Sequence, residues 1–467
     1  MITVEKIGGT SMSQFGDVLA NIVLQKPDAV YGRVFVVSAY AGVTNELLEH
    51  KKSGVPGIYA RFADGADYVE AMDALLGKLK AINAGFVALG LDLAVADRFL
   101  DQRLGALKGY LSSMRHVLAS GYLRRDSVLL AAREMLAAVG EAHSAFNSVA
   151  ILEKKGIRAK LVDLTGFDDD EPYTIDQRIH HAFKGLDLQS QVVVATGYTK
   201  GVEGIMREFD RGYSEVTFSK IAVEIKPAEA IIHKEFHLSS ADPAIVGAAN
   251  TVIVGMTNYD VADQLADVGM EAIHPKAAKP MELAGVPIRL KNTFDPNHPG
   301  TLITKDHRGT RARVEIIAGS PKVTALEIHD PSMVGTVGFD LGIMELFQKH
   351  GVSYILKATN ANSITHVIWD KSCTPALLEE LQSRYKVVTA LPSAIVSAIG
   401  TNIGVPGVLA RAATALANDK VNVNAFSQSL RQTSMQFVVD RGDYQKAIIS
   451  LNRALCLDPA NPAPAIA

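Results

Sequence analysis

The chain opens with residues whose types and spacing suit the handling of phosphate. In KIGGTS, residues 6–11, a lysine precedes two glycines and two hydroxyl side chains at the end of an apolar, strand-like run. Glycines allow close approach of the backbone, N–H groups at a helix start bind anions, and Lys6 adds a compact positive charge. This combination favours phosphoryl transfer, in which the phosphate oxygens gain negative charge. A plain strand turn with a surface lysine is the alternative that these residues alone leave open.

Two further segments carry side chains of the same kind. SAYAGVTN, residues 38–45, delivers Ser38 and Thr44 at a second glycine turn after an apolar run. Adjacent strand ends of an open parallel sheet form one crevice, so we expect this turn beside the first. In REFDRGYSEVTF, residues 207–218, Arg211 could hold a carboxylate, and the serine and glutamate that follow could orient phosphate and metal. Taken alone, this third segment could also be a solvated charged loop.

Several classes of protein are excluded by missing motifs and by composition. The chain lacks GxxxxGK[ST], HRD and DFG, which excludes P-loop and protein kinases, and GVEG is too weak to indicate a dinucleotide site. With 47 basic and 50 acidic residues the net charge is −3, so neither nucleic acid nor a membrane is an expected partner. Apolar runs stay short of the roughly 20 residues of a membrane span, and we expect a cytoplasmic protein. The two cysteines, Cys373 and Cys456, lack the spacing of a disulfide framework or a zinc site.

The elements that must position these residues follow from hydrophobic periodicity. Up to about residue 300, strand-like runs alternate with helical patterns, which predicts a parallel sheet with crossover helices. One such helix begins after the first glycines, with Ser11 and Gln14 resembling a capping box and with one apolar face. That face comprises Phe15, Val18, Leu19, Ile22 and Val23. The Ala- and Leu-rich residues at about 55–135 predict a helical insert.

The C-terminal part repeats itself. A strand, a glycine turn, a helix and two strands occur twice, with Gly338 and Gly407 equivalent and 69 residues apart, and each copy adds an amphipathic helix. We expect residues 1–304 to form a catalytic domain, 305–318 a linker, 319–391 and 392–456 two repeated domains, and 457–467 a loose tail.

Read together, these segments resemble the aspartate kinases of the amino acid kinase family. KIGGTS, SAYAGVTN, the GE of AVGEAHSA, DRGYSEVT, SSADP, IHPKA and VPIRLKNTFDPNHPGTLI follow the order and spacing of that family, and the tandem units resemble its paired ACT domains. The resemblance covers nearly the whole chain. It implies an α/β amino acid kinase fold, with an open, mainly parallel sheet between helices, followed by two α+β ACT domains of βαββαβ order.

The resemblance also implies a reaction in which L-aspartate and MgATP give 4-aspartyl phosphate and ADP, the first step toward lysine, threonine and methionine. A substrate with one ammonium and two carboxylates needs an acidic and a guanidinium partner, which Glu141, at an expected helix start, and Arg211 would supply. Its side-chain carboxylate is already a nucleophile, so no general base is required. ATP and Mg²⁺ are the expected cofactors, and no residue is assigned as a metal ligand.

The site residues carried over from the family fall into four groups. The catalytic set is Lys6, Gly8, Ser214 and Glu215, and the aspartate-binding set is Ser38, Thr44, Glu141 and Arg211. The nucleotide set is Gly8, Gly9, Thr10, Ser11, His233 and Lys234. An amino-acid effector is expected at Met333, Thr336, Gly338 and Asp340.

The chain departs from the family pattern at two places. LGRGGSDYT appears as FDRGYSEVT, so Tyr213 replaces a glycine and Glu215 an aspartate. TDVDGVYTAD appears as HKEFHLSSAD, so Lys234 stands at an aspartate position, and Glu271 stands at the lysine of GAKVLHP. Our hypothesis is that these two charges exchanged together and preserve a pair beside the nucleotide.

Regulation and assembly are expectations of the same resemblance. ACT units usually pair across chains, which predicts a homodimer or higher homo-oligomer. KIGGTSMS with HKEFHLSSADP resembles the specialised aspartate kinases of ectoine synthesis, which predicts weak or altered feedback by lysine. Two alternatives remain: a chain that lost ATP turnover and serves as an amino-acid sensor or assembly subunit, and a kinase for glutamate, carbamate or UMP.

Overall fold

The computed structural model describes residues 1–209, 212–270 and 272–457, and the chain forms two compact units. Unit 1 comprises Met1–His237 and Lys276–Pro299, and unit 2 comprises Leu238–Pro275 and the chain from Gly300 onward. The predicted domain boundaries divide the chain differently and stay predictions.

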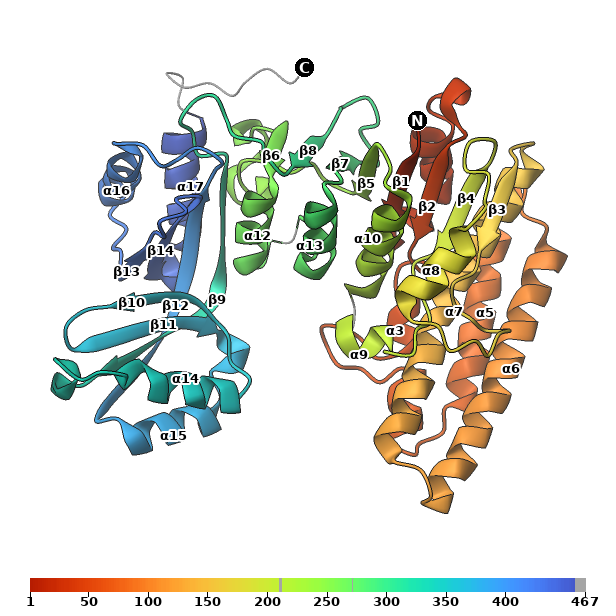
Figure 1. Cartoon of the computed structure of the whole chain (residues 1–467), viewed down its shortest axis with the longest axis horizontal. Coiled ribbons are helices and arrows are strands. Elements are labelled where there is room, and N and C mark those ends of the chain that lie inside the picture. The colour runs from red at the N-terminus through yellow and green to blue at the C-terminus, as the bar shows by residue number, and fades with distance from the viewer. Residues whose placement is uncertain (210–211, 271, 458–467) are drawn as a thin grey trace. The chain divides into compact units, whose positions relative to one another are not determined.

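Unit 1 is built on a parallel sheet (Figure 1). Its strands run in the order β3 (Ala159–Val162), β4 (Val192–Thr196), β2 (Arg33–Val37), β1 (Thr3–Ile7), β5 (Glu229–Lys234) and β7 (Ile288–Asn292). Lys6 pairs in register with Val36 on one neighbour and Ile232 on the other. The first strand of the chain is therefore central, and its carboxyl end meets those of β2 and β5, as expected for an open α/β sheet.

Short helices follow the strand ends, and the predicted apolar face is confirmed. They include α1 (Gly9–Ser13), α2 (Phe15–Val18), a π-helical turn (Leu19–Val23), α3 (Val43–Leu47), α8 (Ile175–Phe183), α9 (Ile205–Phe209), α10 (Tyr213–Ile225) and α13 (Pro275–Ala284). All five predicted residues of the apolar face are buried. The predicted capping box is wrong, because α1 already begins at Gly9 with Gly8 as its N-cap, and Gln14 is its C-cap.

The Ala- and Leu-rich segment is mainly helical. It contains α4 (Ile58–Ala63), α5 (Val69–Gly85) and α6 (Leu93–Ser120), and it continues into α7 (Arg125–Lys154), which returns to the sheet. By length and composition α7 could span a membrane, but 78% of its most apolar 18-residue window is buried inside the protein. The helix therefore packs as a core helix of unit 1.

Unit 2 contains a small α/β part and a larger antiparallel sheet. The small part has the parallel strands β6 (Met256–Asn258) and β8 (Thr301–Thr304), with α11 (Pro243–Val246) and α12 (Tyr259–Asp267). The larger sheet has the order β10 (Tyr354–Thr359), β11 (Ser363–Trp369), β9 (Ile316–His329), β12 (Val387–Ile399), β14 (Ser434–Asp440) and β13 (Ala425–Ser427). Helices α14 (Phe339–Lys349), α15 (Pro375–Arg384), α16 (Val408–Asn418) and α17 (Tyr444–Leu451) accompany this sheet (Figure 1).

The repeat predicted from the sequence is confirmed by matching elements. Gly338 and Gly407 are both N-caps in the left-handed region, with φ of 78° and 93°, and each precedes a helix of 11 residues. A side chain at either position would be strained, so the turn requires glycine. Two hydrophobic cores lie in the repeats, one around Leu326, Leu346 and Ile368, the other around Val396, Leu416 and Phe437.

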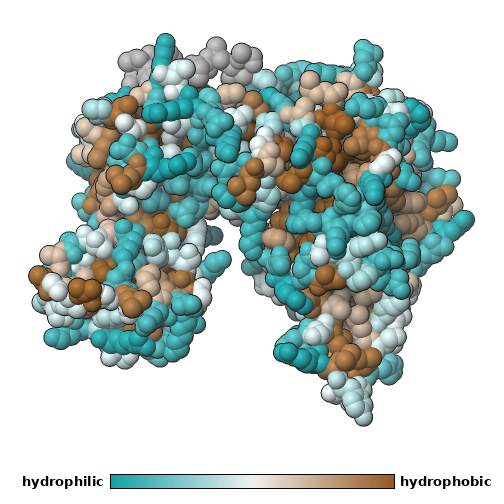
Figure 2. Space-filling model, in the orientation of Figure 1, coloured by the Kyte–Doolittle hydropathy of each residue, from teal (hydrophilic) through white to brown (hydrophobic). Residues whose placement is uncertain are grey.

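The two repeats share their long strands. In β9, Val323–His329 pairs with β11, whereas Ile316–Ser320 pairs with the second half of β12. The core of the second repeat accordingly includes Val314 and Ile317, which precede the whole first repeat in the chain. In Figure 2, hydrophobic side chains are scattered over the surface of the part formed by β10, β11, α14 and α15.

Candidate active site

The lysine of the glycine-rich segment forms an ion pair at the carboxyl edge of the unit 1 sheet. Lys6 lies on the central strand β1, and its Nζ is 3.4 Å from Oε1 of Glu215 in the first turn of α10. The two side chains are only 11% and 18% exposed. The Lys6 ammonium is thus held on a strand and is largely shielded from water. Its electrostatic attraction for a bound anion is therefore stronger than it would be in bulk water.

The ends of β1 and β2 lie against each other. The backbone N–H of Ser38 donates to the carbonyl of Ile7 at 3.1 Å, and the N–H of Ala41 donates to Oγ of Ser13 at 2.9 Å. A Cβ on Gly9 would lie 2.6 Å from the carbonyl oxygen of Ala39, so this contact requires glycine. The structure therefore brings the first two sequence segments into one loop cluster.

A buried carboxylate lies behind this cluster. Glu141 is 2% exposed, and its Oε1 accepts hydrogen bonds from Tyr213 at 2.9 Å and from Ser214 at 3.5 Å. Its Oε2 is buried and has no hydrogen-bond partner among the described residues. Burial raises the pKa of Glu141 to about 7, although the hydrogen bond from Tyr213 acts in the opposite direction.

The position of Glu141 corrects the sequence interpretation, which placed it at a helix start. It lies in the middle of α7, within the 30-residue helix Arg125–Lys154. The preceding Gly140 is needed for packing, because a Cβ there would lie 2.5 Å from the Cβ of Ala39. The helix can therefore approach the β2 loop closely and present Glu141 beside it.

The other described residues that we predict to bind substrate or phosphate lie directly after the same strands. Ser38 and Thr44 are half-buried, directly after β2 and in the first turn of α3, and Thr10 is exposed in α1. The hydroxyl of Ser144, three residues after Glu141, donates to the carbonyl of Ser38 at 2.9 Å, which ties α7 to this loop. A Cβ on Gly197 would lie 2.9 Å from Oγ of Ser214, so the end of β4 also packs closely against the site.

Two predicted nucleotide residues have side chains committed elsewhere. Ser11 is fully buried, and its hydroxyl lies 3.1 Å from Oγ1 of Thr293. His233 is 5% exposed, and its Nε2 lies 2.8 Å from Oε2 of Glu5, which Arg33 also binds. Since side chains alternate along a strand, Glu5 and His233 face away from Lys6. Any contact of His233 with a nucleotide would therefore involve its backbone.

The hypothesis of a charge exchange stays a prediction. Lys234 is half-buried at the end of β5, and its backbone carbonyl accepts from the N–H of Thr293 at 2.9 Å. Glu271, its proposed partner, lies outside the described residues, as does Arg211, the expected clamp for a substrate carboxylate.

The structure adds two residues that the sequence analysis missed. Tyr213 binds Glu141, although the sequence analysis treated it only as a departure from the family pattern. Glu235 lies beside the glycine segment, since a Cβ on Gly8 would be 4.0 Å from its Oε1. The signal for Glu235 was its position at the end of a strand that neighbours β1, where side chains face the same crevice.

Of the four expected effector residues of the first repeat, Asp340 lies in a cluster of charged and polar side chains. Gly338 caps α14, and the carboxylate of Asp340 in its first turn forms an ion pair with Lys357 of β10. Nε2 of His366 on β11 lies 3.7 Å from Oδ1 of Asp340, and this imidazole is fully buried. Thr336 donates its hydroxyl to the carbonyl of Ser332, and Met333 packs against the core of this repeat.

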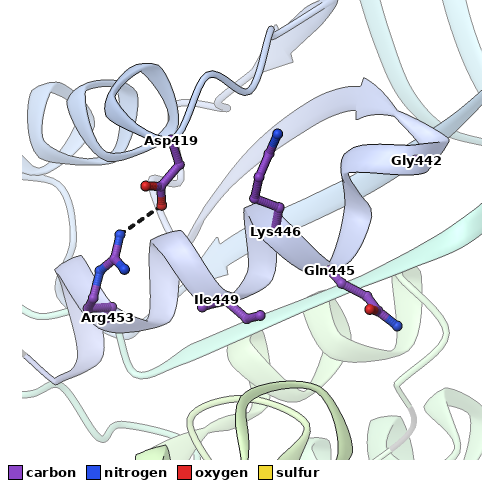
Figure 3. Close-up of a pocket in the computed structure, with 6 residues that line it drawn as sticks. All are labelled: Asp419, Gly442, Gln445, Lys446, Ile449 and Arg453. Atoms are coloured by element: carbon purple, nitrogen blue, oxygen red, sulfur yellow. Dashed lines mark hydrogen bonds and ion pairs between the residues drawn. The ribbon is translucent and has the colours of Figure 1, made fainter.

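A separate hollow lies on the second repeat (Figure 3). It is lined by Asp419, Gly442, Gln445, Lys446, Ile449 and Arg453. Arg453 binds Asp419 at 2.7 Å across the hollow, and Lys446 binds Asp443 at 2.7 Å. These charged side chains form ion pairs with one another, as is common on a solvated surface. We therefore do not interpret the hollow as a reaction site.

Known proteins match the chain along its length. Residues 1–292 match the amino acid kinase family, and residues 396–455 match the ACT domain. The chain is 46% identical to aspartate kinase Ask_Ect of Stutzerimonas stutzeri (strain A1501), over 100% of both proteins. It is 25% identical to aspartokinase 1, chloroplastic, of Arabidopsis thaliana, over 97% of this chain and 79% of that protein.

Solved structures show the same fold. The aspartate kinase of Clostridium acetobutylicum has a TM-score of 0.74 at 21% identity, covering 97% of this chain and 100% of its own. Aspartokinase III of E. coli, in complex with lysine and aspartate, has a TM-score of 0.72 at 20% identity, covering 97% and 99%. With the sheet and site described above, these matches show that the chain belongs to the amino acid kinase family. Within that family it belongs to the aspartate kinases, and the predicted fold class is confirmed.

Proposed function

We propose that the chain transfers the γ-phosphoryl group of ATP to the side-chain carboxylate of L-aspartate, giving 4-aspartyl phosphate and ADP. The observation that carries this proposal is the buried carboxylate of Glu141, whose Oε2 has no hydrogen-bond partner among the described residues. A buried polar atom of this kind normally has a partner, and the ammonium of an amino acid would satisfy it. The full-length relative named an aspartate kinase supports the same substrate.

The geometry allows the reaction without a general base. The side-chain carboxylate of aspartate attacks the γ-phosphorus, and the bond from that phosphorus to the bridging oxygen of ADP breaks. Lys6, held 3.4 Å from Glu215, offers its charge to the oxygens that become more negative during transfer. Closely packed loops around Gly9 and Ser38 keep both partners in position, which supplies much of the rate.

The residues present fit a magnesium ion that arrives with ATP. Within the described ranges no group of three or more His, Cys, Asp or Glu residues could hold a metal by itself. Mg²⁺ in kinases is bound by substrate phosphates with one or two carboxylates, and Glu215 and Glu235 lie where they could contribute. The ion would neutralise part of the phosphate charge when bound.

The ACT repeats would sense an amino acid at the cluster around Asp340. E. coli aspartokinase III has been solved with lysine, which makes lysine one candidate effector. In this chain Lys357 already neutralises Asp340, so a cationic side chain would have to displace an internal ammonium. This supports weak feedback by lysine, as a pathway to a compatible solute such as ectoine would require.

We also propose that the chain forms a homodimer and is located in the cytoplasm. The first repeat exposes apolar side chains at the start of α14, with Val337 99%, Val334 65% and Leu341 63% exposed. A second copy of the chain would cover them, so we place a homodimer contact here. A cytoplasmic location agrees with a substrate and a nucleotide that are both abundant there.

A substrate panel tests the proposed function. ADP release is measured with MgATP and, separately, L-aspartate, L-glutamate, carbamate and UMP. The proposal expects turnover with aspartate and at most trace turnover with the others. Turnover with another member of the panel would replace the substrate, and no turnover by folded protein would favour a sensing or assembly role.

A further inference from the structure

Tyr213 lies in the candidate site and has no role in the reaction proposed above. It is the first residue of α10, between Gly212 and Ser214, and it is only 3% exposed. Its hydroxyl donates to Oε1 of Glu141 at 2.9 Å. A buried phenol that ends on a buried carboxylate fixes the direction in which that carboxylate points.

The ring of Tyr213 is itself held in place. It packs edge-to-face with Tyr198, with ring centroids 5.9 Å apart and planes at 75°. The Tyr198 hydroxyl donates to Oε2 of Glu134 at 2.6 Å. Glu134 and Glu141 are seven residues apart on α7, so they lie on one face of that helix. Each of the two tyrosines therefore donates a hydrogen bond to one of two carboxylates on the same helix.

The two oxygens of Glu141 have different surroundings. Oε1 accepts from Tyr213 and, at 3.5 Å, from Ser214, and the backbone N–H of Ala39 also faces the carboxylate. Oε2 is buried without a partner among the described residues. An isolated carboxylate rotates freely about its last bond, whereas this one is held with one oxygen saturated and the other available.

We propose that Tyr213 is a positioning and specificity residue, which holds Oε1 of Glu141 so that Oε2 faces the α-ammonium of the substrate. The inference rests on the proposed function, since it assumes that the substrate is an α-amino acid. It predicts that the site discriminates strongly against dicarboxylates without an ammonium, such as succinate. Such a ligand would leave a buried, oriented charge unpaired.

The pH dependence of binding should reflect the same contact. Among the described residues, the groups that face the Glu141 carboxylate are Tyr213 and Ser214 from α10 and Ala39 after β2, with Tyr198 interacting at longer range. The Tyr213 hydroxyl stabilises the ionised carboxylate, so its removal raises the pKa of Glu141 further. The acidic limb of kcat/KM for aspartate should then move to higher pH.

The test is Tyr213→Phe, which removes one oxygen and keeps the packed ring. We expect the KM for aspartate to rise about 10-fold, because the lost bond goes to a charged group, while kcat changes little. The acidic limb of kcat/KM should shift upward by about one pH unit, and the preference for aspartate over succinate should fall about 10-fold. Incorporation of 3-fluorotyrosine at position 213, a stronger donor of similar size, should move the limb downward.

Tyr198→Phe is the matched control. It also removes a buried phenol oxygen that binds a glutamate of α7, but that glutamate is Glu134. A merely structural role of Tyr213 would make the two variants alike, with lower thermal stability and an unchanged acidic limb.

Calorimetric titration with aspartate and succinate separates this inference from the proposed function. Weaker binding of aspartate to Tyr213→Phe, with binding of succinate unchanged, would support the role of Tyr213 even if ATP turnover were absent. Equal binding and an unchanged preference in Tyr213→Phe and wild type would overturn it, even if wild type proves to be an efficient aspartate kinase.

Discussion

Nζ of Lys6 lies 3.4 Å from Oε1 of Glu215, and both side chains are largely shielded from water. One residue comes from the first strand of the chain, the other from a helix more than two hundred residues later. The ion pair holds the ammonium group of Lys6 at the point where β1 ends, beside Gly8 and Gly9. When ATP binds, we expect its phosphates to compete with Glu215 for that charge, so that the same lysine would serve both the resting protein and the transfer step.

Aspartate turnover should depend on pH through Glu141. Its pKa is raised to about 7, chiefly by burial, and only the ionised form can pair with an ammonium. We therefore expect kcat/KM for aspartate to fall as the pH drops below about 7. Glu141→Gln should abolish that limb and lower kcat/KM at least 100-fold, because it removes the ion pair in a buried site. A pH series of initial rates checks this, and an unchanged limb in Glu141→Gln would assign the titration to another group.

The close contact at Gly9 should be essential to the site. Gly9→Ala would place a Cβ 2.6 Å from the Ala39 carbonyl oxygen and push the two loops apart. We expect a loss of about 100-fold in kcat/KM, since misplacement by about 1 Å has that effect. Gly16→Ala is the control, because its Cβ would lie 3.8 Å from Leu89, an ordinary contact. Equal activity of the two variants would show that the loops tolerate separation.

The buried cluster of Glu5, Arg33 and His233 should support stability. Burial alone would raise the pKa of Glu5, but Arg33 and His233 together hold it well below its usual range. A depressed carboxyl pKa stabilises the fold above the unfolded pKa of about 4.5, and this stability is lost as the pH falls through the folded pKa. Glu5→Gln should cost about 3–5 kcal/mol at pH 7, since it leaves Arg33 without its buried partner.

Urea unfolding from pH 7 to pH 3 measures both effects. Wild type should lose stability below about pH 4.5, and Glu5→Gln should lose less over that interval. Glu46→Gln is the control, because Glu46 and its partner Lys78 are each about half exposed. Its effect should stay within about 1 kcal/mol. A similar effect of both substitutions would remove the special role of Glu5.

Feedback by lysine should depend on Lys357. This side chain neutralises Asp340 in the first repeat, so Lys357→Ala should free a carboxylate for a cationic amino acid. We expect wild type to resist micromolar lysine, and the variant to bind it about 10-fold more tightly. Lys349→Ala, which breaks the exposed pair with Glu380, is the control. Inhibition of wild type by micromolar lysine would contradict this account.

The sequence predicts the parts of the molecule that follow from local rules. Local patterns of a few residues are enough to predict the glycine segment after β1 and the buried face of the next helices. They also predict the glycine turns at Gly338 and Gly407, each of which precedes a helix. The helical insert is also predictable, because its composition favours helix throughout.

The remainder depends on contacts between distant segments. The sequence predicts Glu141 at a helix start, but Glu141 lies within α7, and the preceding Gly140 allows that helix to approach Ala39 closely. The sequence predicts Ser11 in the nucleotide set, but its hydroxyl faces Thr293, which no local pattern indicates. Likewise, the sharing of β9 and β12 between the repeats arises from pairing along two long strands, which sequence periodicity does not reveal.

The most direct test compares wild type with Lys6→Ala, using MgATP, L-aspartate and hydroxylamine, which traps an acyl phosphate as its hydroxamate. We expect aspartate-dependent hydroxamate and ADP in wild type, and a rate at least 100-fold lower in folded Lys6→Ala, because the charge beside the transferring phosphoryl group is gone. Hydroxamate formation by Lys6→Ala at the wild-type rate would contradict the role given to this lysine. The absence of hydroxamate with folded wild type would contradict the aspartate kinase itself.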